Sequence, residues 1–196
     1  MNHKTDQRRP PRHAPPLLTI TSARTENLDP LSRASIIRVC VAAHQEESFK
    51  HLFTYIPSGG YHFLAYQEQE IVSHAVVTTR WLQPEGMPIF RTAYVDAVAT
   101  IPVLQGKGYG STVMLELAHA LSIGVGNYQI ACLETDKPGF YTRLGWQSWR
   151  GPLAGRGENG LIPTPGVGVM IFRLPQTPRL NLDSGLTIED QGGRIW

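Results

Sequence analysis

The sequence predicts an α+β fold, in which a mixed, mostly antiparallel central sheet of about seven strands is flanked by helices. The first observation is a unit in the middle of the chain, where a strand-like run at 90–100 leads through a glycine-rich loop into a helix. The second is a set of short strand-like runs, two of which are joined by a polar link typical of a hairpin. The third is a helical pattern at 29–44 that precedes this hairpin.

The first half of the chain begins with a partly alternating strand at 17–23. The helix at 29–44 has Asp29 as its expected N-cap and Pro30 as its first helical residue. Residues 45–60 are expected to form a shorter helix or a loop that ends in a turn. The hairpin then joins strands at 61–67 and 70–83.

The second half is organised around the strand at 90–100 and the helix that begins near residue 111. A buried strand follows at 128–134, and "KPGFYTRLGW" is a short helix with Pro138 in its first turn. The runs "WQSWRG" and "VGVMIFRLP" are expected to be the last strands. The expected core-facing side of the helix consists of Val113, Met114, Leu117, Ala118 and Leu121.

Length and composition predict a single domain at 17–196, preceded by a disordered, basic, proline-rich leader at 1–16. No apolar run approaches the roughly 18 residues of a membrane span, and a net charge of +2 does not indicate a nucleic-acid surface. No apolar region follows the paired arginines of the leader, so no secretory signal is expected. Cys40 and Cys132 lie in apolar surroundings, which favours buried thiols and a reducing cytoplasm.

The loop "QGKGYG" at 105–110 has a Q-x-x-G-x-G spacing. It could be a surface turn that caps a helix, or a cradle for phosphates. A helix N-terminus offers unpaired N–H groups and a partial positive charge, and glycines let an anion approach them. The spacing matches neither a Walker A motif nor the dinucleotide fingerprint. The strand immediately before the loop and the helix immediately after it favour a phosphate site.

This loop, together with "KPGFYTRLGW", resembles the acetyl-CoA site of the Gcn5-related N-acetyltransferase (GNAT) superfamily. The resemblance implies the GNAT fold, with acetyl-CoA as cosubstrate and its pyrophosphate on the amides of 105–110. It also implies that the pantetheine arm pairs with 98–100 and that the Val98 N–H polarises the thioester carbonyl. The histidines show no metal-binding spacing, so no metal is expected. The implied cofactor-binding residues are Val98, Ala99, Thr100, Gln105, Gly106, Lys107, Gly108, Tyr109, Gly110 and Ser111.

Two side chains are candidates for proton transfer. Asp96 lies in an otherwise apolar strand and could act as a base through a water molecule, or it could only hydrogen-bond nearby loops. Tyr141 corresponds to the tyrosine that many relatives use as general acid toward the departing thiolate. The alternative for Tyr141 is an aromatic side chain packed with Phe140.

A finer resemblance, carried by "YVDAVA", "YTRLGWQSWRGP", "IFRLP" and the ending "GGRIW", is to the aminoglycoside 2′-N-acetyltransferases. It implies a C-terminal tail that returns to an acidic acceptor cleft, a role in antibiotic resistance and a possible homodimer. Acidic groups suit a polycationic sugar. The acceptor-binding residues expected from it are Asp96, Ala97, Glu134, Arg194 and Trp196, with Glu46 aligned loosely and Trp149 chosen to stack on a sugar ring.

The sequence departs from that family in the number of acids. Arg194 stands where the family has an aspartate two residues before the terminal tryptophan, and "PTPGVGV" lacks the family's acidic turn. Fewer acids and an added arginine favour a less cationic acceptor such as kasugamycin, which has few amines and a carboxylate-bearing amidine. The alternatives are an acetyltransferase for another small amine or a peptide N-terminus, and a silent acetyl-CoA-binding sensor.

Overall fold

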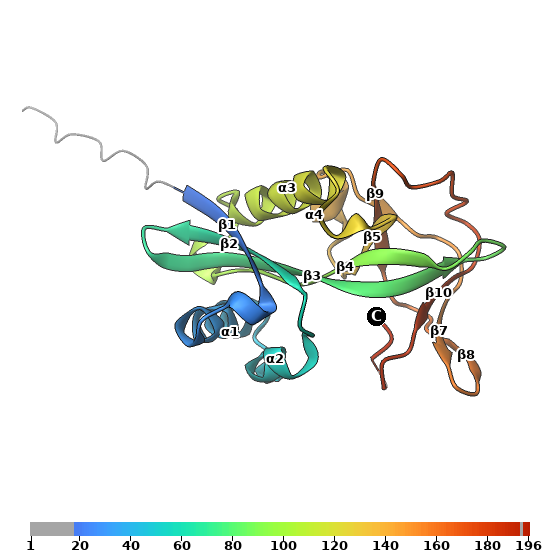
Figure 1. The fold of residues 1–196 in the computed structure, drawn as a ribbon, viewed down its shortest axis with the longest axis horizontal. Coiled ribbons are helices and arrows are strands. Elements are labelled where there is room, and N and C mark those ends of the chain that lie inside the picture. Colours follow the sequence, from blue (N-terminus) through green and yellow to red (C-terminus); the bar gives the residue numbers. More distant parts are fainter. Residues whose placement is uncertain (1–17, 193) are drawn as a thin grey trace, which may run out of the picture.

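The computed structural model describes residues 18–192 and 194–196, and the expected leader at 1–16 lies outside them (Figure 1). The α-helices are α1 (Pro30–His44), α2 (Leu52–Tyr55), α3 (Tyr109–Ser122) and α4 (Pro138–Thr142). The strands are β1 (Leu18–Arg24), β2 (Tyr61–Gln67), β3 (Glu70–Pro84), β4 (Phe90–Thr100), β5 (Ile130–Glu134), β6 (Gln147–Ser148), β7 (Leu153–Gly157), β8 (Gly160–Pro163), β9 (Val169–Arg173) and β10 (Leu186–Glu189). None of the helices in this part of the chain is long and apolar enough to cross a membrane.

The strands form one mixed sheet, which confirms the predicted fold class. The order is β6-β9-β5-β4-β3-β10-β7-β8, with β1 and β2 added beside β3. Only the β4–β5 and β10–β7 pairs are parallel within the described residues. The long strand β3 shares one edge between two partners, because β2 pairs with its first half and β10 with its last residues.

The described residues contain ten strands, more than the expected seven or so. The segment at 153–163 was not expected to form strands, and the structure has β7 and β8 there. Its sequence, "LAGRGENGLIP", is rich in glycine and shows no regular apolar alternation. The strand at 169–173 was expected to be the last, but β10 follows it and pairs with both β3 and β7. Short strands of this kind are held by the neighbours they pair with, which a single-segment pattern does not show.

Helices cover both faces of the sheet (Figure 1), with α3 and α4 on one face and α1 and α2 on the other. The expected apolar side of α3 is confirmed, because all five of its predicted residues are buried. On the other face, Ile36, Val39 and Cys40 of α1 pack toward the sheet. The α1 start is also as predicted, since Asp29 Oδ1 accepts hydrogen bonds from the amides of Leu31 (2.9 Å) and Ser32 (3.0 Å).

Both cysteines are buried free thiols, as expected. Cys40 lies on the buried side of α1 and Cys132 lies on β5, in two different clusters of apolar residues. Burial raises the pKa of the Cys40 thiol to about 12, and it raises the pKa of Cys132 as well. Both side chains therefore stay protonated and act as small apolar groups in the core.

A buried chain of polar side chains crosses the sheet from β2 to β4. The Ala97 carbonyl can only accept, so it fixes a proton on His74 Nδ1, 2.9 Å away. His74 Nε2 then accepts from His62 Nδ1 at 2.9 Å. His62 Nε2 in turn accepts from the Thr25 hydroxyl at 3.0 Å. Both histidines are neutral, because burial lowers the pKa of His62 to about 3 and of His74 to about 4.

This pair should make folding stability depend on pH. The folded-state pKa values lie below 6.5, the value for an ordinary histidine, so the unfolded chain binds more protons below that pH. The stabilisation is complete above pH 6.5 and is lost as the pH falls toward 4. Urea unfolding at about pH 7.5 and about pH 5 should show a loss on the order of tenfold in the folding equilibrium constant per histidine.

The matched variants are His62→Gln and His51→Gln, because His51 is an exposed histidine outside the chain of hydrogen bonds. His62→Gln should flatten the pH dependence, whereas His51→Gln should leave it as in the wild type. An equal pH dependence in all three proteins would contradict the assignment.

Candidate active site

A cavity of about 780 Å3 opens where β4 and β5 diverge. The two strands pair only from Thr92–Tyr94 to Ile130–Cys132. Just beyond this point β4 carries a bulge, because two residues stand between the pairs Val76–Asp96 and His74–Ala99 where β3 has one. Ala97 in the bulge has a φ of +49°, a left-handed conformation that is uncommon for a residue with a Cβ. The bulge turns β4 away from β5 and leaves room for ligands between them.

The cavity brings together nearly all of the residues that the sequence singled out. Its lining includes the expected catalytic pair Asp96 and Tyr141. It also includes Val98, Ala99, Thr100, Gln105, Gly106, Gly108, Tyr109, Gly110 and Ser111 from the expected cofactor set, and Ala97, Glu134, Arg194, Trp196 and Glu46 from the expected acceptor set. Lys107 is exposed and does not line it.

The glycine loop ends in the first turn of α3. Gly106 and Gly108 have φ values of +75° and +92°, and a Cβ added to either would meet no atom within 4 Å. Gly110 is confined instead, because its Cβ would lie 3.1 Å from the Thr100 hydroxyl oxygen. Gly108 is the N-cap of α3, so the following amides have no partner within the helix. The loop is therefore an open cradle of backbone N–H groups at the end of the cavity beside β4.

Asp96 is not a free carboxylate. Its Oδ1 accepts a hydrogen bond from the Ala97 amide at 2.6 Å, and its Oδ2 is ion-paired with Arg194. The Arg194 guanidinium also lies over the Tyr55 ring, 4.3 Å from the centroid. The C-terminal segment thus places a cation directly on the carboxylate that the sequence identified as the base.

A second carboxylate, Glu134, stands at the end of β5 on the other side of the divergence. Partial burial raises its pKa, and the negative charge of Asp96 adds to this, while Arg194 opposes it. A carboxylate with a raised pKa is a better proton acceptor than one at its ordinary value. Glu134 therefore faces Asp96 as a group that can take up a proton.

Tyr141 lies in α4 and is 8% exposed. Burial raises its pKa to about 12, with smaller contributions from the charges of Asp136 and Asp96. The phenol therefore keeps its proton at neutral pH and can donate it. The Phe140 ring packs edge-on against it at 4.9 Å between centroids, which agrees with the packing interpretation, while the role of general acid stays a prediction.

Residues 58–148 match the model of the acetyltransferase (GNAT) domain family. Similar solved structures include Eis1 from Mycobacterium abscessus (TM-score 0.57, 16% identity, 69% of this chain and 32% of that one). A probable N-acyltransferase from Enterococcus faecalis is also similar, with a TM-score of 0.51 and 18% identity over 66% of this chain and 32% of that one. A third similar structure is the ribosomal-protein-S18-alanine N-acetyltransferase from Escherichia coli, with a TM-score of 0.52 and 17% identity over 83% of this chain and 96% of that one. The chain spans about a third of the length of the first two.

Residues 58–148 are thus similar to a GNAT acetyltransferase domain.

GNAT domains use acetyl-CoA, and the residues of this cavity fit that cosubstrate. The open, positive-φ cradle at Gly106 and Gly108 presents backbone amides to a pyrophosphate without side chains in the way. The bulge at Ala97 leaves the half-buried end of β4 lining the cavity, where an extended arm can lie along 98–100. Within the described residues, no cluster of three or more His, Cys, Asp or Glu side chains could hold a metal ion.

The structure corrects the expectation for Trp149. Its indole was expected to stack on a sugar ring, but it does not line the cavity. It is 6% exposed and packs with the core residues of β4, β5 and β9, while its Nε1 donates to the Ser184 carbonyl at 2.7 Å. Trp196 lines the cavity instead, and its Nε1 donates to the Thr164 hydroxyl at 2.8 Å.

Some lining residues were not singled out by the sequence. His44, at the end of α1, lines the cavity and stacks on Phe49 with 4.5 Å between centroids. Lys137 and Arg143, around α4, also line it. No local pattern marks these residues, because the contact depends on how α1 and α4 pack across the sheet. The nearest signal is the position of Lys137 and Arg143 on either side of Tyr141.

Acetyl-CoA binding should depend on the conformation of Gly108. Gly108→Ala puts a Cβ on a residue with a φ of +92°, which costs about 1–2 kcal/mol in place or shifts the cradle. We expect the Kd for acetyl-CoA to rise ~10-fold, measured by calorimetry.

Gly86→Ala is the matched control, because Gly86 has a φ of +72° and an equally open Cβ position in the β3–β4 turn. Both variants should lose a similar amount of folding stability, but only Gly108→Ala should lose affinity. Equal affinities in the two variants would rule out the cradle.

Proposed function

We propose that the protein transfers the acetyl group of acetyl-CoA to an amino group, the 2′ amine, of an aminoglycoside of low cationic charge such as kasugamycin, and so confers resistance. The observation that supports this most directly is the Arg194–Asp96 ion pair inside the cavity. An acceptor with many ammonium groups would meet a cation there. An acceptor that carries both an amine and a carboxylate would meet a partner for each.

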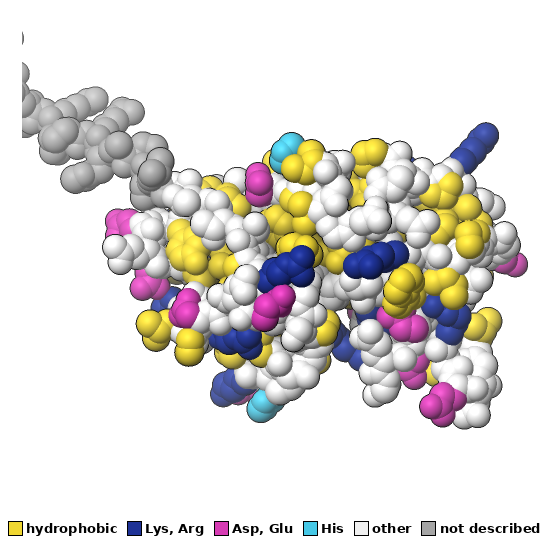
Figure 2. Space-filling model, in the orientation of Figure 1, with side chains coloured by type: hydrophobic (Ala, Val, Ile, Leu, Met, Phe, Trp, Pro, Cys, Tyr) yellow, Lys and Arg dark blue, Asp and Glu magenta, His cyan; other side chains and the backbone are white. Residues whose placement is uncertain are grey.

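The charges of the acceptor side agree with this proposal. Asp96, Glu134 and Glu46 supply negative charge, and Arg194 supplies a positive charge among them. In the space-filling view the molecule is hollowed between the α1–α2 side and the β7–β8 side, and side chains of both signs show beside the hollow (Figure 2). A mixed lining of this kind favours an acceptor with charges of both signs.

The proposed reaction needs a proton acceptor before the attack. The ammonium of the acceptor gives its proton to a carboxylate through a water molecule, with Asp96 as the base that the sequence indicates. Arg194 must then exchange its partner, so that its charge moves from Asp96 to the acceptor's carboxylate. Glu134, with its raised pKa, is the second carboxylate that can receive the proton.

The transfer itself forms one bond and breaks another. The free amine attacks the acyl carbon, the carbon–sulfur bond breaks, and the electron pair leaves on sulfur. Tyr141 gives its hydroxyl proton to the sulfur, and the extra proton of the newly acylated nitrogen passes through water to restore the tyrosine hydroxyl, which leaves a neutral amide. The Val98 amide is our candidate for polarising the acyl oxygen, and the positioning of amine and thioester would supply much of the acceleration.

The direct test is the release of CoA by the purified protein with acetyl-CoA and a panel of acceptors. The panel contains kasugamycin, gentamicin, kanamycin, a polyamine and a peptide amine, with products identified by mass spectrometry. A product carrying one added acetyl group on kasugamycin, with none on gentamicin, would support the proposal. Broad activity on gentamicin-like drugs would keep the aminoglycoside assignment and remove the low-charge refinement. Acetyl-CoA binding without turnover of any acceptor would favour the silent sensor.

Removal of the Tyr141 hydroxyl should slow the chemical step. Tyr141→Phe keeps the ring that packs on Phe140 and Trp146 but loses the proton donor, so kcat should fall ~10²–10⁴-fold. The Kd for acetyl-CoA should stay the same. Tyr128→Phe is the matched control, since that buried hydroxyl contacts Thr79 outside the cavity. A similar kcat in both variants would remove Tyr141 from the mechanism.

Reversal of the charge at Arg194 should change acceptor preference. Arg194→Asp places two acids together at the cavity, so kcat/KM for kasugamycin should fall ~10-fold or more, while that for polycationic aminoglycosides should rise. Arg150→Ala is the control, because it breaks the exposed pair with Asp183 away from the cavity. An unchanged kcat/KM for kasugamycin would exclude the proposed role of Arg194.

A further inference from the structure

One guanidinium is almost completely buried beneath the C-terminal segment. The Arg80 side chain, on β3, is 3% exposed. An arginine cannot lose its charge inside a protein, so it is tolerated there only if its donors are satisfied. The groups that accept hydrogen bonds from the Arg80 guanidinium therefore indicate the role of this residue.

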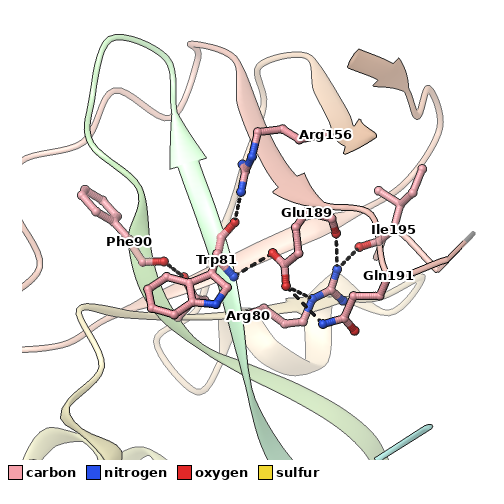
Figure 3. A network of polar contacts seen from close by, with 8 residues as sticks. Arg80, Trp81, Phe90, Arg156, Glu189, Gln191 and Ile195 are labelled. Atoms are coloured by element: carbon pink, nitrogen blue, oxygen red, sulfur yellow. Dashed lines mark hydrogen bonds and ion pairs between the residues drawn. The ribbon is translucent and has the colours of Figure 1, made fainter. Parts of the chain in front are cut away.

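The partners of Arg80 belong to β10 and to the segment that follows it (Figure 3). Arg80 Nε donates to Glu189 Oε1 at 2.6 Å. Its Nη2 donates to two backbone carbonyls, those of Glu189 at 2.6 Å and of Ile195 at 2.7 Å. The other carboxylate oxygen, Glu189 Oε2, accepts from the Trp81 amide at 2.8 Å, so the carboxylate is itself tied to β3.

One nitrogen atom, Arg80 Nη2, thus binds a backbone carbonyl at each end of residues 189–195. The segment leaves the sheet at Glu189, turns so that the Gln191 amide donates to the Arg194 carbonyl at 3.1 Å, and returns to Arg80 at Ile195. Ile195 lies between Arg194 and Trp196, which both line the cavity. A backbone fixed at 195 leaves its two neighbours little freedom, so their side chains stand at the acceptor side.

Arg80 does not line the cavity itself. Its guanidinium lies over the Tyr94 ring, 5.1 Å from the centroid, and Tyr94 separates it from the open space. An effect of Arg80 on an acceptor therefore passes through the segment that it holds or through Tyr94, which lines the cavity; the hydrogen-exchange readout below reports on the segment alone.

We propose that Arg80 is a positioning residue, whose buried guanidinium ties Glu189 and Ile195 to β3 and thereby places Arg194 and Trp196 at the acceptor site. This inference rests on the acetyl transfer proposed above for that site. It assigns acceptor selection to an arginine that contacts no acceptor.

The test compares Arg80→Met with Arg156→Met. Arg156 belongs to the same network, but its side chain donates to the Trp81 carbonyl at 2.5 Å (Figure 3) and to the Thr187 hydroxyl at 2.7 Å instead of to the segment. Its main-chain carbonyl accepts from the Asp190 amide at 3.1 Å, and the substitution keeps this contact. Two readouts need no turnover: amide hydrogen exchange of residues 190–196, and the Kd for acetyl-CoA. Arg80→Met should speed exchange ~10-fold or more in that segment and leave the Kd within about twofold, whereas Arg156→Met should change neither.

The kinetic readout is the KM of the acceptor that the panel identifies. Arg80→Met should raise it ~10-fold, and the same change in an Arg194→Ala background should raise it much less, because both act through Arg194. Additive effects, or an exchange rate that does not change, would overturn the proposal. If the wild type turns over no acceptor, the proposed function is contradicted. Amide hydrogen exchange and the Kd for acetyl-CoA then still test whether Arg80 holds the segment in place. If Arg80→Met does not fold, Arg80→Lys, which keeps the charge but loses the planar fork, gives the same comparison.

Discussion

The site depends on the left-handed conformation of one alanine. Ala97 has a φ of +49°, which costs on the order of 1 kcal/mol or more for a residue with a Cβ. Hydrogen bonds hold Ala97 in this conformation at both of its backbone groups. The Asp96 carboxylate accepts from the Ala97 amide, and His74 donates to the Ala97 carbonyl. The bulge that results separates β4 from β5. Without it the two parallel strands would continue side by side and close the space that the cavity occupies.

The two sides of the cavity offer different kinds of interaction to a ligand. The cradle at 105–110 presents backbone amides and positive-φ glycines, so it suits an anionic group such as the pyrophosphate that is common to all CoA thioesters. The acceptor side relies on charged side chains, namely Asp96, Glu134 and Arg194, whose number and sign can change without any change of fold. The similarity to the GNAT domain family favours acetyl transfer as the reaction, whereas the choice of acceptor would depend on a few side chains.

The sequence predicted the parts of the structure that depend on local signals. The N-cap at Asp29, the apolar side of α3 and the loop at 105–110 each follow from residues close together in the chain. The strands β7, β8 and β10 were missed because pairing with neighbours, rather than their own pattern, holds them. Trp149 was misplaced for a related reason: a tryptophan near a site has the same local pattern whether it faces the site or the core, and only its bond to Ser184 decides. The contact of Arg194 with Asp96, 98 residues earlier, has no local signal at all.

The two arginine–carboxylate pairs of the C-terminal segment differ in burial, and this difference gives them different roles. The Arg80–Glu189 pair is buried, so loss of one partner would leave an uncompensated charge at a cost of about 3–5 kcal/mol. In the Arg194–Asp96 pair the arginine side chain is 37% exposed and the aspartate side chain 16%, so water screens this guanidinium more than that of Arg80. In the proposed reaction an acceptor carboxylate would take Arg194 over from Asp96, while Arg80 keeps the backbone in place. A fixed anchor beside an exchangeable partner would let the segment select an acceptor without having to move.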